Sequence, residues 1–340
     1  MLENLQSLIP PFDWQQVVVD PWSKSQWVET MWVTGMGVMV AWACGLVGCF
    51  LILRRMAMVG DAVSHTILPG LVVAFLISGS RSGWVMFVGA VVAGVFTIWF
   101  IELIHSRSLI KQDAAIGICF SALFALGVLL VSRYANQVDL DQDCVLYGEI
   151  GQIYWSPTVA GMPEPAFSMA IILVLVLVLL AAFYRRLLVT TFDPGLARSL
   201  GIGTTRYHYG LMTVLALVVV AAFKAVGAIM VVAMLIVPGA TAYLLSKRLP
   251  MMLALTLVHG LLGSVIGFHL GQWLNCSTGA AMVTAGVGLF FITWLATRIT
   301  RMIQRQKSRR HHDVMDDDHT AFTRPERSEP DPHPVRGATR

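Results

Sequence analysis

The stretch AMVGDAVSHTILPGLVVAFLIS, residues 57–78, combines two features that oppose each other in a membrane. Its apolar residues suffice to cross the ~30 Å hydrocarbon core of a bilayer, which takes about 20 residues of helix. It also holds Asp61 and His65, and ionisable side chains are costly within lipid. The apolar residues therefore predict the fold, and the two ionisable ones indicate where function is to be sought.

Apolar runs of similar length recur along the chain. Of its 340 residues, 56% are hydrophobic and 13% charged, and the mean hydropathy is +0.70, which excludes a water-soluble fold. We predict an all-α membrane protein, a polytopic bundle of about eight or nine transmembrane helices, because lipid offers backbone groups no water and no strand-like alternation is present. The sixth and seventh runs are divided only by Lys224 and Ala225. The candidate spans are 33–53, 57–78, 84–104, 113–132, 167–188, 207–224, 226–245, 253–271 and 280–299.

The two ends of the chain differ from this central part, residues 33–300. Residues 1–32 carry four tryptophans, which predicts an external segment with its indoles at headgroup depth. Residues 301–340 have too little apolar content to fold alone, so we expect a cytoplasmic disordered tail. Its histidines and the run Asp316 to Asp318 could bind a divalent cation weakly, but a solvated polar tract is favoured. The residues in question are Trp14, Trp22, Trp27, Trp32, His311, His312 and His319.

The placement of lysine and arginine predicts the orientation, because these residues accumulate on the cytoplasmic side. Nine spans with the N-terminus outside put most of them inside and place the C-terminus in the cytoplasm. The expected inner residues are Arg54, Arg55, Arg107, Lys111, Arg185, Arg186, Arg198, Arg206, Lys247, Arg248 and the cluster from Arg298 to Arg310. The expected outer ones are Lys24, Arg81, Arg133 and Lys224.

Several function classes are excluded. The basic residues form short clusters beside apolar runs rather than one continuous face, which argues against nucleic-acid binding. The five cysteines show no C-x-x-C spacing, so no zinc-knuckle or redox motif is present. No G-x-x-x-x-G-K-[ST] motif occurs, so the chain has no P-loop ATPase site, and any ATP energy must come from a partner.

Asp61 and His65 are the candidate metal ligands. Four residues apart on a helix, they lie on one face, so a carboxylate oxygen and an imidazole nitrogen can converge on one divalent ion such as manganese, iron or zinc. The alternative is that Asp61 caps a helix restarted at Gly60, with Ser64 and His65 bonded to neighbouring spans. A helix interrupted at Pro69-Gly70 favours a transport pathway, because transporters place binding sites at such breaks.

Other ionisable residues in or near the spans are assigned structural roles. His259 and His269 are ten residues apart, too far to share an ion, and we expect each to be a hydrogen-bonded packing histidine. Glu102 and Asp113 flank a turn with Arg107 and Lys111, where interfacial charge pairing is expected.

A short helix is predicted in the loop VTTFDPGLARSLGIGTTR, residues 189–206. Asp193-Pro194 is a helix start and Gly201 a stop, enclosing about two turns. Such a helix suits docking into a groove of another protein, although a surface helix without a partner is the alternative.

Five blocks, in order, resemble the permease subunit of the bacterial ABC importers for manganese, zinc and iron. They are FLILRRMAMVGDAVSHTILPG (50–70), DAAIGICFSALFALGVLL (113–130), FDPGLARSLGI (192–202), AVGAIMVVAMLIVPGATAYLL (225–245) and STGAAMVTAG (277–286). The block containing Asp61 and His65 is the most specific of them.

The resemblance implies a multi-pass protein of the bacterial inner membrane that works by alternating access. Its implied partners are cytoplasmic ABC ATPase subunits that bind ATP, a second permease (a copy or a homologue), and an extracytoplasmic metal-binding protein. Asp61 and His65 match the family's transit ligands for the metal cargo, and no permanently bound cofactor is implied. The coupling helix, about 192–202, is matched by Asp193, Pro194, Leu196, Ala197, Leu200 and Gly201.

Two further features follow the resemblance. The loop LDQDCVLYGEI, residues 140–150, resembles the manganese- and iron-type members more than the zinc-type ones. Cys144 and Cys276 both fall on the expected outer side, where a disulfide between them is compatible with the compartment.

Three rival functions are left open by the residues alone. A secondary transporter would couple substrate to protons through Asp61 and the buried histidines. An ABC permease for a metal chelate would need a wide apolar-aromatic cavity rather than Asp61. For a receptor or scaffold that transports nothing, substitutions at Asp61 and His65 would change stability only.

Overall fold

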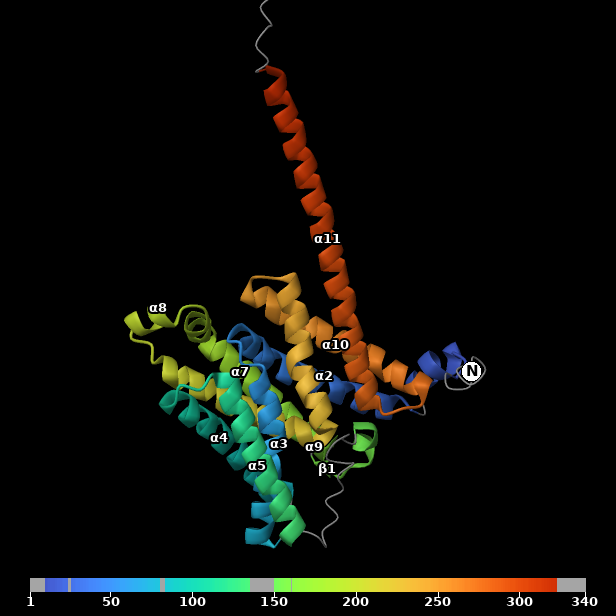
Figure 1. Cartoon of the computed structure of the whole chain (residues 1–340). Helices are drawn as coiled ribbons and strands as arrows, with labels where there is room; N and C mark the ends of the chain where they lie inside the picture. The colour runs from blue at the N-terminus through green and yellow to red at the C-terminus, as the bar shows by residue number, and fades with distance from the viewer. Residues whose placement is uncertain (1–9, 24–25, 80–82, 135–149, 160, 323–340) are drawn as a thin grey trace, which may run out of the picture. The chain divides into compact units, whose positions relative to one another are not determined.

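The computed structural model describes residues 10–23, 26–79, 83–134, 150–159 and 161–322 (Figure 1). Apart from short elements near the ends of helices, the described residues are helical, as predicted. The elements are η1 (Gln15–Val19), η2 (Asp20–Trp22), α2 (Trp27–Leu53), α3 (Met58–Ser78), α4 (Gly83–Arg107), α5 (Gln112–Tyr134), η3 (Ile150–Trp155), β1 (Thr158–Val159), β2 (Met162–Pro163), α7 (Glu164–Phe192), α8 (Pro194–Ser199), α9 (Thr204–Leu245), α10 (Leu249–Leu274) and α11 (Thr278–Phe322).

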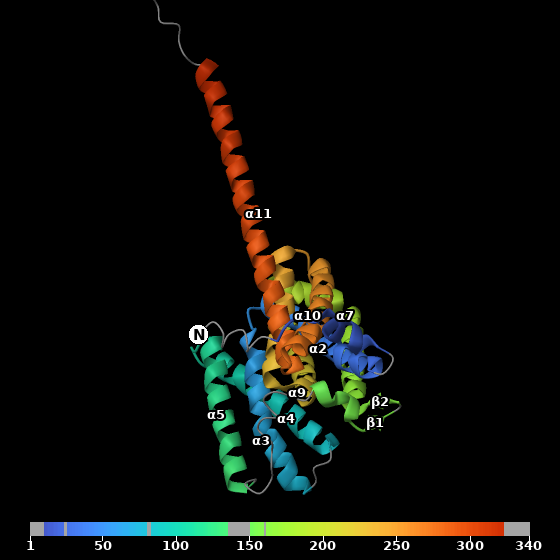
Figure 2. The ribbon, with the colours of Figure 1, turned by 90° about the vertical axis from the view of Figure 1, so that its right-hand side faces the viewer.

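Successive long helices from α2 to α4 run in alternating directions, joined by short turns. α2 and α3 are linked by a turn at Arg55, which takes a left-handed conformation (φ 59°). α3 and α4 lie antiparallel, because Gly70 adjoins Gly89 while the hydroxyls of Thr66 and Thr97 are 2.8 Å apart. α5 packs beside α3 and parallel to it, and Figure 2 shows this group turned by 90°.

α9 reverses direction at Gly227. There φ is 74° and ψ is 168°, a conformation open essentially to glycine alone. Before it, α9 is antiparallel to α4, since Gly94 adjoins Ala216 and His208 contacts Glu102. After it, α9 is parallel to α2, where Gly48 packs directly on the Leu235 carbonyl. The two halves therefore form a hairpin within one element.

This reversal resolves the sixth and seventh predicted spans. The described residues contain eight helices long and apolar enough to cross a membrane, and one shorter apolar helix, Met230–Leu245. The break expected at Lys224 is in fact at Gly227. The charged side chain of Lys224 does not change the backbone direction, whereas the positive φ of Gly227 does. The eight candidate spans include the first half of α9, and Met230–Leu245 in its second half corresponds to the seventh predicted run, so the prediction of about eight or nine spans agrees with the structure.

α3 is not interrupted at Pro69-Gly70, so that expectation was wrong. The helix continues through Pro69 to Ser78. Gly70 instead lets α4 approach closely, because a Cβ there would meet Gly89 O at 2.5 Å and Ala93 Cβ at 2.4 Å. The glycine is explained by packing between helices rather than by a break.

The chain divides into two compact units, residues 1–294 and 295–340. In the first, the segment before α2 packs on α10: Trp273 Nε1 donates to Pro10 O at 3.0 Å, and Thr30 Oγ1 of α2 donates to Pro21 O at 2.6 Å. α2 begins at Trp27, within the segment that we had expected to end at residue 32. Its interfacial position stays a prediction.

The second unit differs from the expected disordered tail over residues 301–322, where α11 continues to Phe322. The sequence contains neither glycine nor proline between Gly288 and Pro325, so nothing in it ends the helix earlier. Residues 323–340 lie outside the described residues.

Candidate functional site

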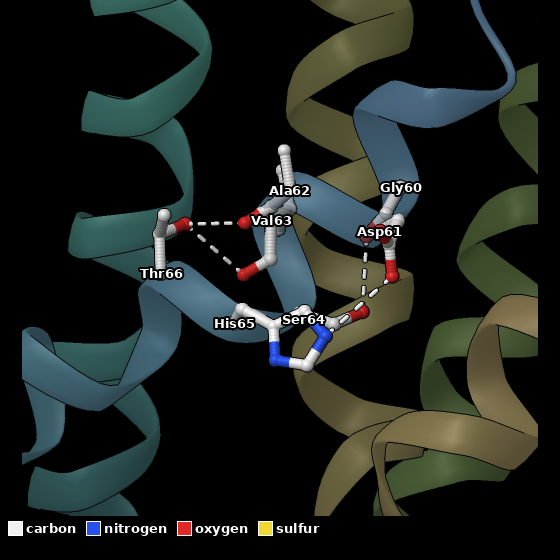
Figure 3. Close-up of polar contacts among 7 residues, drawn as sticks. All are labelled: Gly60, Asp61, Ala62, Val63, Ser64, His65 and Thr66. Atoms are coloured by element: carbon white, nitrogen blue, oxygen red, sulfur yellow. Dashed lines mark hydrogen bonds and ion pairs between the residues drawn. The ribbon is translucent and has the colours of Figure 1, made fainter. Parts of the chain in front are cut away.

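Asp61 and His65 point to the same side of α3, one turn apart (Figure 3). Nε2 of His65 is 3.6 Å from Oδ1 of Asp61. Two ligands about 2.1 Å from one metal ion, at a tetrahedral angle, stand roughly 3.4 Å apart. The expected convergence of the two side chains is therefore present, and their spacing suits one ion between them.

Asp61 does not cap α3, contrary to the alternative interpretation. The helix begins at Met58, and its N-cap, Ala57, makes no side-chain hydrogen bond. Ser64, which that alternative joined to a neighbouring span, donates to Gly60 O of its own helix at 2.9 Å (Figure 3). A capping role therefore does not explain the carboxylate.

Two phenylalanines of α5 flank the imidazole of His65. The ring of His65 meets Phe120 edge-on, with centroids 5.3 Å apart, and Phe124 at 5.8 Å. The side chains of Asp61 and His65 stay 39% and 34% exposed. The aromatic rings thus contact the histidine from one side, while both side chains remain partly exposed at the subunit surface.

Two protein ligands are fewer than a closed metal site needs. Within the described ranges, no group of three or more His, Cys, Asp or Glu side chains is close enough to hold a metal ion. A cation between Asp61 and His65 would therefore complete its shell with water, carbonyl oxygens or another subunit. Such an incomplete set favours exchange over permanent retention.

A second acid–histidine pair joins α4 to α9, and the sequence prediction missed it. Nε2 of His208 is 3.4 Å from Oε2 of Glu102. Glu102 does not pair with Arg107 as expected, because a five-residue separation puts Arg107 about 140° around the helix. That Glu102 faces His208 could only be recognised from the register of α4 against α9.

Arg54, just after α2, ties this second pair to α7. Its Nε donates to Thr191 Oγ1 at 3.2 Å and an Nη to Thr190 Oγ1 at 3.3 Å. Its other Nη lies 3.5 Å from Nδ1 of His208. Burial lowers the pKa of Arg54, but a guanidinium keeps its charge in proteins. The Arg54 cluster, meaning Arg54 with Glu102, His208, Thr190 and Thr191, therefore links four helices.

The histidines of α10 are hydrogen-bonded, as predicted. His259 is 7% exposed, and its Nε2 is 3.2 Å from Gly286 O. His269 places Nδ1 2.8 Å from Val17 O, and its Nε2 accepts from Trp22 Nε1 at 3.4 Å. Both rings serve the packing of α10 against its neighbours.

The short helix α8 lies where the loop pattern placed it. Asp193 is the N-cap of α8: its Oδ1 accepts a hydrogen bond from Leu196 N at 2.9 Å. Pro194 follows as the first residue of the helix. Gly201 (φ 73°) ends the helix, with Ile202 N donating to Ala197 O at 2.9 Å.

One side of α8 is buried against the subunit and the other is exposed. Ala197 is fully buried, whereas Leu196 and Leu200 are 49% and 61% exposed. The helix thus presents leucines outward, which is the arrangement expected of a docking helix.

Two of the sequence predictions concern residues outside the described ranges. Cys144 and residues 140–149 of the loop LDQDCVLYGEI lie outside the described residues. Pairing of Cys144 with Cys276 therefore stays a prediction, as does the metal preference inferred from that loop.

Comparison with known proteins places this geometry in a family. Residues 27–297 match the ABC 3 transport family. The chain is 46% identical over 255 residues to the manganese transport system membrane protein MntD of Bacillus subtilis, covering 74% of this chain and 86% of that one. It is 40% identical over 274 residues to the zinc transport system membrane protein TroD of Treponema pallidum, covering 78% and 73%.

A solved structure is also similar. It is PsaBC from Streptococcus pneumoniae in complex with a Fab, with 34% sequence identity and a TM-score of 0.68. The similarity covers 81% of this chain and 94% of that one. The helical architecture described above is therefore shared with an experimentally determined membrane protein.

Proposed function

Because the chain belongs to the ABC 3 transport family, we propose that it is the permease of an ATP-driven importer of a divalent transition-metal ion. The relatives above are named for manganese and zinc transport, and iron is the third ion in the proposal. The ion passes from an extracytoplasmic binding protein, through a pathway lined by Asp61 and His65, to the cytoplasm. ATP is hydrolysed by partner subunits.

The observation that carries the proposal is the accessible carboxylate–imidazole pair on a membrane-crossing helix. Asp61 is 39% exposed on α3, an apolar helix long enough to span the bilayer. A charged side chain facing lipid is unfavourable, so this face needs a water-filled path or another subunit against it. A pathway at the contact with a second permease satisfies that need.

Transport also requires that the ion be released. Two ligands from each permease, together with water, bind an ion firmly enough to select it and loosely enough to let it go. Borderline ligands of this kind favour manganese, iron or zinc over calcium or magnesium. In alternating access, the Asp61–His65 pair is then exposed first to the extracytoplasmic side of the membrane and afterwards to the cytoplasm.

We place the N-terminus outside and α8 in the cytoplasm, on the distribution of lysine and arginine. In that orientation α8 is the coupling helix, and Leu196 and Leu200 dock into the ATPase subunit. Replacing both by alanine should reduce transport-coupled ATP hydrolysis at least tenfold, because two apolar anchors are lost. Arg198→Ala, on the same helix, is the matched control and should change transport-coupled ATP hydrolysis less than threefold.

Cellular uptake of manganese, iron and zinc tests the function as a whole. Elemental analysis is made in a bacterial strain whose only importer is this permease with its ATPase, and in the same strain with a hydrolysis-deficient ATPase. We expect one metal to accumulate only with the active ATPase. Uptake that is indifferent to the ATPase would instead indicate a secondary transporter and overturn the proposal.

A further inference from the structure

An open groove of about 650 Å³ lies between α7 and the first half of α9, away from the Asp61–His65 pair. Its volume is within the range of sites that hold small organic ligands. One end is formed by Leu200, Gly201 and Ile202, directly after α8. None of the residues that line it is acidic.

The groove is amphipathic along its length. Two arginines, Arg186 of α7 and Arg206 of α9, line the end beside the α8 loop. The other end is apolar, with Val176 and Leu179 on one wall and Val214 on the other. The ten-residue separation between Val176 and Arg186 corresponds to about 15 Å of helix, long enough to accommodate much of an acyl chain.

The cationic end is organised to receive an anion. Arg186 donates to the Tyr207 hydroxyl at 2.7 Å, which fixes the guanidinium and leaves its other N–H groups for a ligand. The Tyr207 ring is itself held edge-on by Phe183, with centroids 6.0 Å apart. A charge-assisted bond from a fixed guanidinium to a phosphate is among the stronger polar contacts in proteins.

We propose that this groove binds one anionic phospholipid of the cytoplasmic leaflet. Its phosphate lies between Arg186 and Arg206, and one acyl chain lies along Val176, Leu179 and Val214. Charge complementarity selects an anionic headgroup, and the apolar wall distinguishes a lipid from free phosphate. The proposal takes only the orientation of α8 from the proposed function, so it can fail while metal transport stands.

Native mass spectrometry of the full-length, detergent-solubilised permease tests the proposal. The protein is titrated with phosphatidylglycerol or with phosphatidylcholine of the same acyl chains. We expect phosphatidylglycerol to bind at least tenfold more tightly, because each arginine near an anionic headgroup contributes roughly a factor of five. The double variant Arg186→Gln/Arg206→Gln should remove that preference, whereas Arg185→Gln, outside the groove, should change it less than twofold.

Gly210→Leu tests the acyl-chain part separately. Gly210 lines the groove, and a Cβ there meets nothing within 4 Å, so the larger side chain fills the groove without a clash. We expect phosphatidylglycerol binding to fall at least fivefold while the melting temperature is unchanged. Inorganic phosphate at millimolar concentration should not compete.

Three outcomes would overturn the proposal. If Arg185→Gln acts as strongly as the double variant, the lipid binds by surface charge alone. If Gly210→Leu has no effect or phosphate competes, the groove holds no acyl chain. If the mass spectra show phosphatidylglycerol on the monomeric permease but none on the dimeric permease, a second copy of the chain covers the groove.

Discussion

Among the described residues, two acid–histidine pairs lie at similar height in the bundle, and they differ in what surrounds them. Asp61 and His65 lie on α3, and Glu102 and His208 join α4 to α9. The antiparallel register of α3 and α4, in which Thr66 meets Thr97, brings residue 102 to the level of residue 61. Depth in the membrane therefore does not distinguish the pairs.

The neighbouring groups do distinguish them. A guanidinium nitrogen of Arg54 is 3.5 Å from His208, and this positive charge disfavours a divalent cation there. The ring of His65 instead makes edge-on contacts with the apolar rings of Phe120 and Phe124. Similar side chains thus belong to a helix-joining cluster in one place and to a partly exposed pair in the other.

The largest effect is expected on metal uptake. Asp61→Ala and His65→Ala should each reduce uptake at least 100-fold, because each variant removes one of the two ligands that every permease contributes to the proposed site. Glu102→Gln should reduce it less than fivefold. Elemental analysis at matched membrane abundance measures both, and equal losses at the two acids would erase the distinction between the pairs.

The next effect concerns stability rather than transport. Arg54→Ala should lower the free energy of unfolding by about 2 kcal/mol, because bonds to Thr190 and Thr191 are lost in a partly buried cluster. In a chain of this size that corresponds to about 3 °C in melting temperature. Thermal unfolding in detergent measures it.

Two variants serve as controls for this stability effect. His65→Ala and Arg185→Ala should each shift the melting temperature by less than 2 °C. A larger shift for His65→Ala than for Arg54→Ala would show that the α3 pair, too, is structural.

A smaller effect should come from the aromatic support of His65. Phe124→Ala removes one ring contact, and such contacts contribute about 0.5–1.5 kcal/mol, so uptake should fall roughly two- to tenfold. Phe124→Tyr keeps the ring and should restore most of the activity. Full activity of Phe124→Ala would mean that α5 does not position the imidazole.

The smallest effect is expected at Ser64, next to the pair. Its hydroxyl is bonded within its own helix, to Gly60 O, so Ser64→Ala should change uptake less than twofold. The same uptake assay measures it. A tenfold loss would instead place this hydroxyl in the metal pathway.

The parts of the molecule that local sequence signals govern were predictable. Apolar runs marked the helices, and Asp193-Pro194 with Gly201 marked α8, because capping and positive φ are properties of a few adjacent residues. The four-residue spacing of Asp61 and His65 likewise sufficed to bring their side chains together.

What depends on contacts between distant segments was not predictable. Glu102 and His208 are separated by more than a hundred residues, and their contact depends on the register of α4 against the first half of α9. Pro69 did not break its helix, and Gly70 beside it is explained by the close packing of α4 on α3. A proline or a lysine in an apolar run is thus a weak guide to where a helix ends.

In the proposed pathway the transported ion rests between Asp61 and His65. Anomalous X-ray scattering from crystals of the permease–ATPase complex grown with Mn²⁺ locates the ion directly. We predict a peak within about 2.5 Å of both Asp61 Oδ1 and His65 Nε2. A peak beside Glu102 and His208, with none at α3, would contradict the assignment of Asp61 and His65 as the metal ligands.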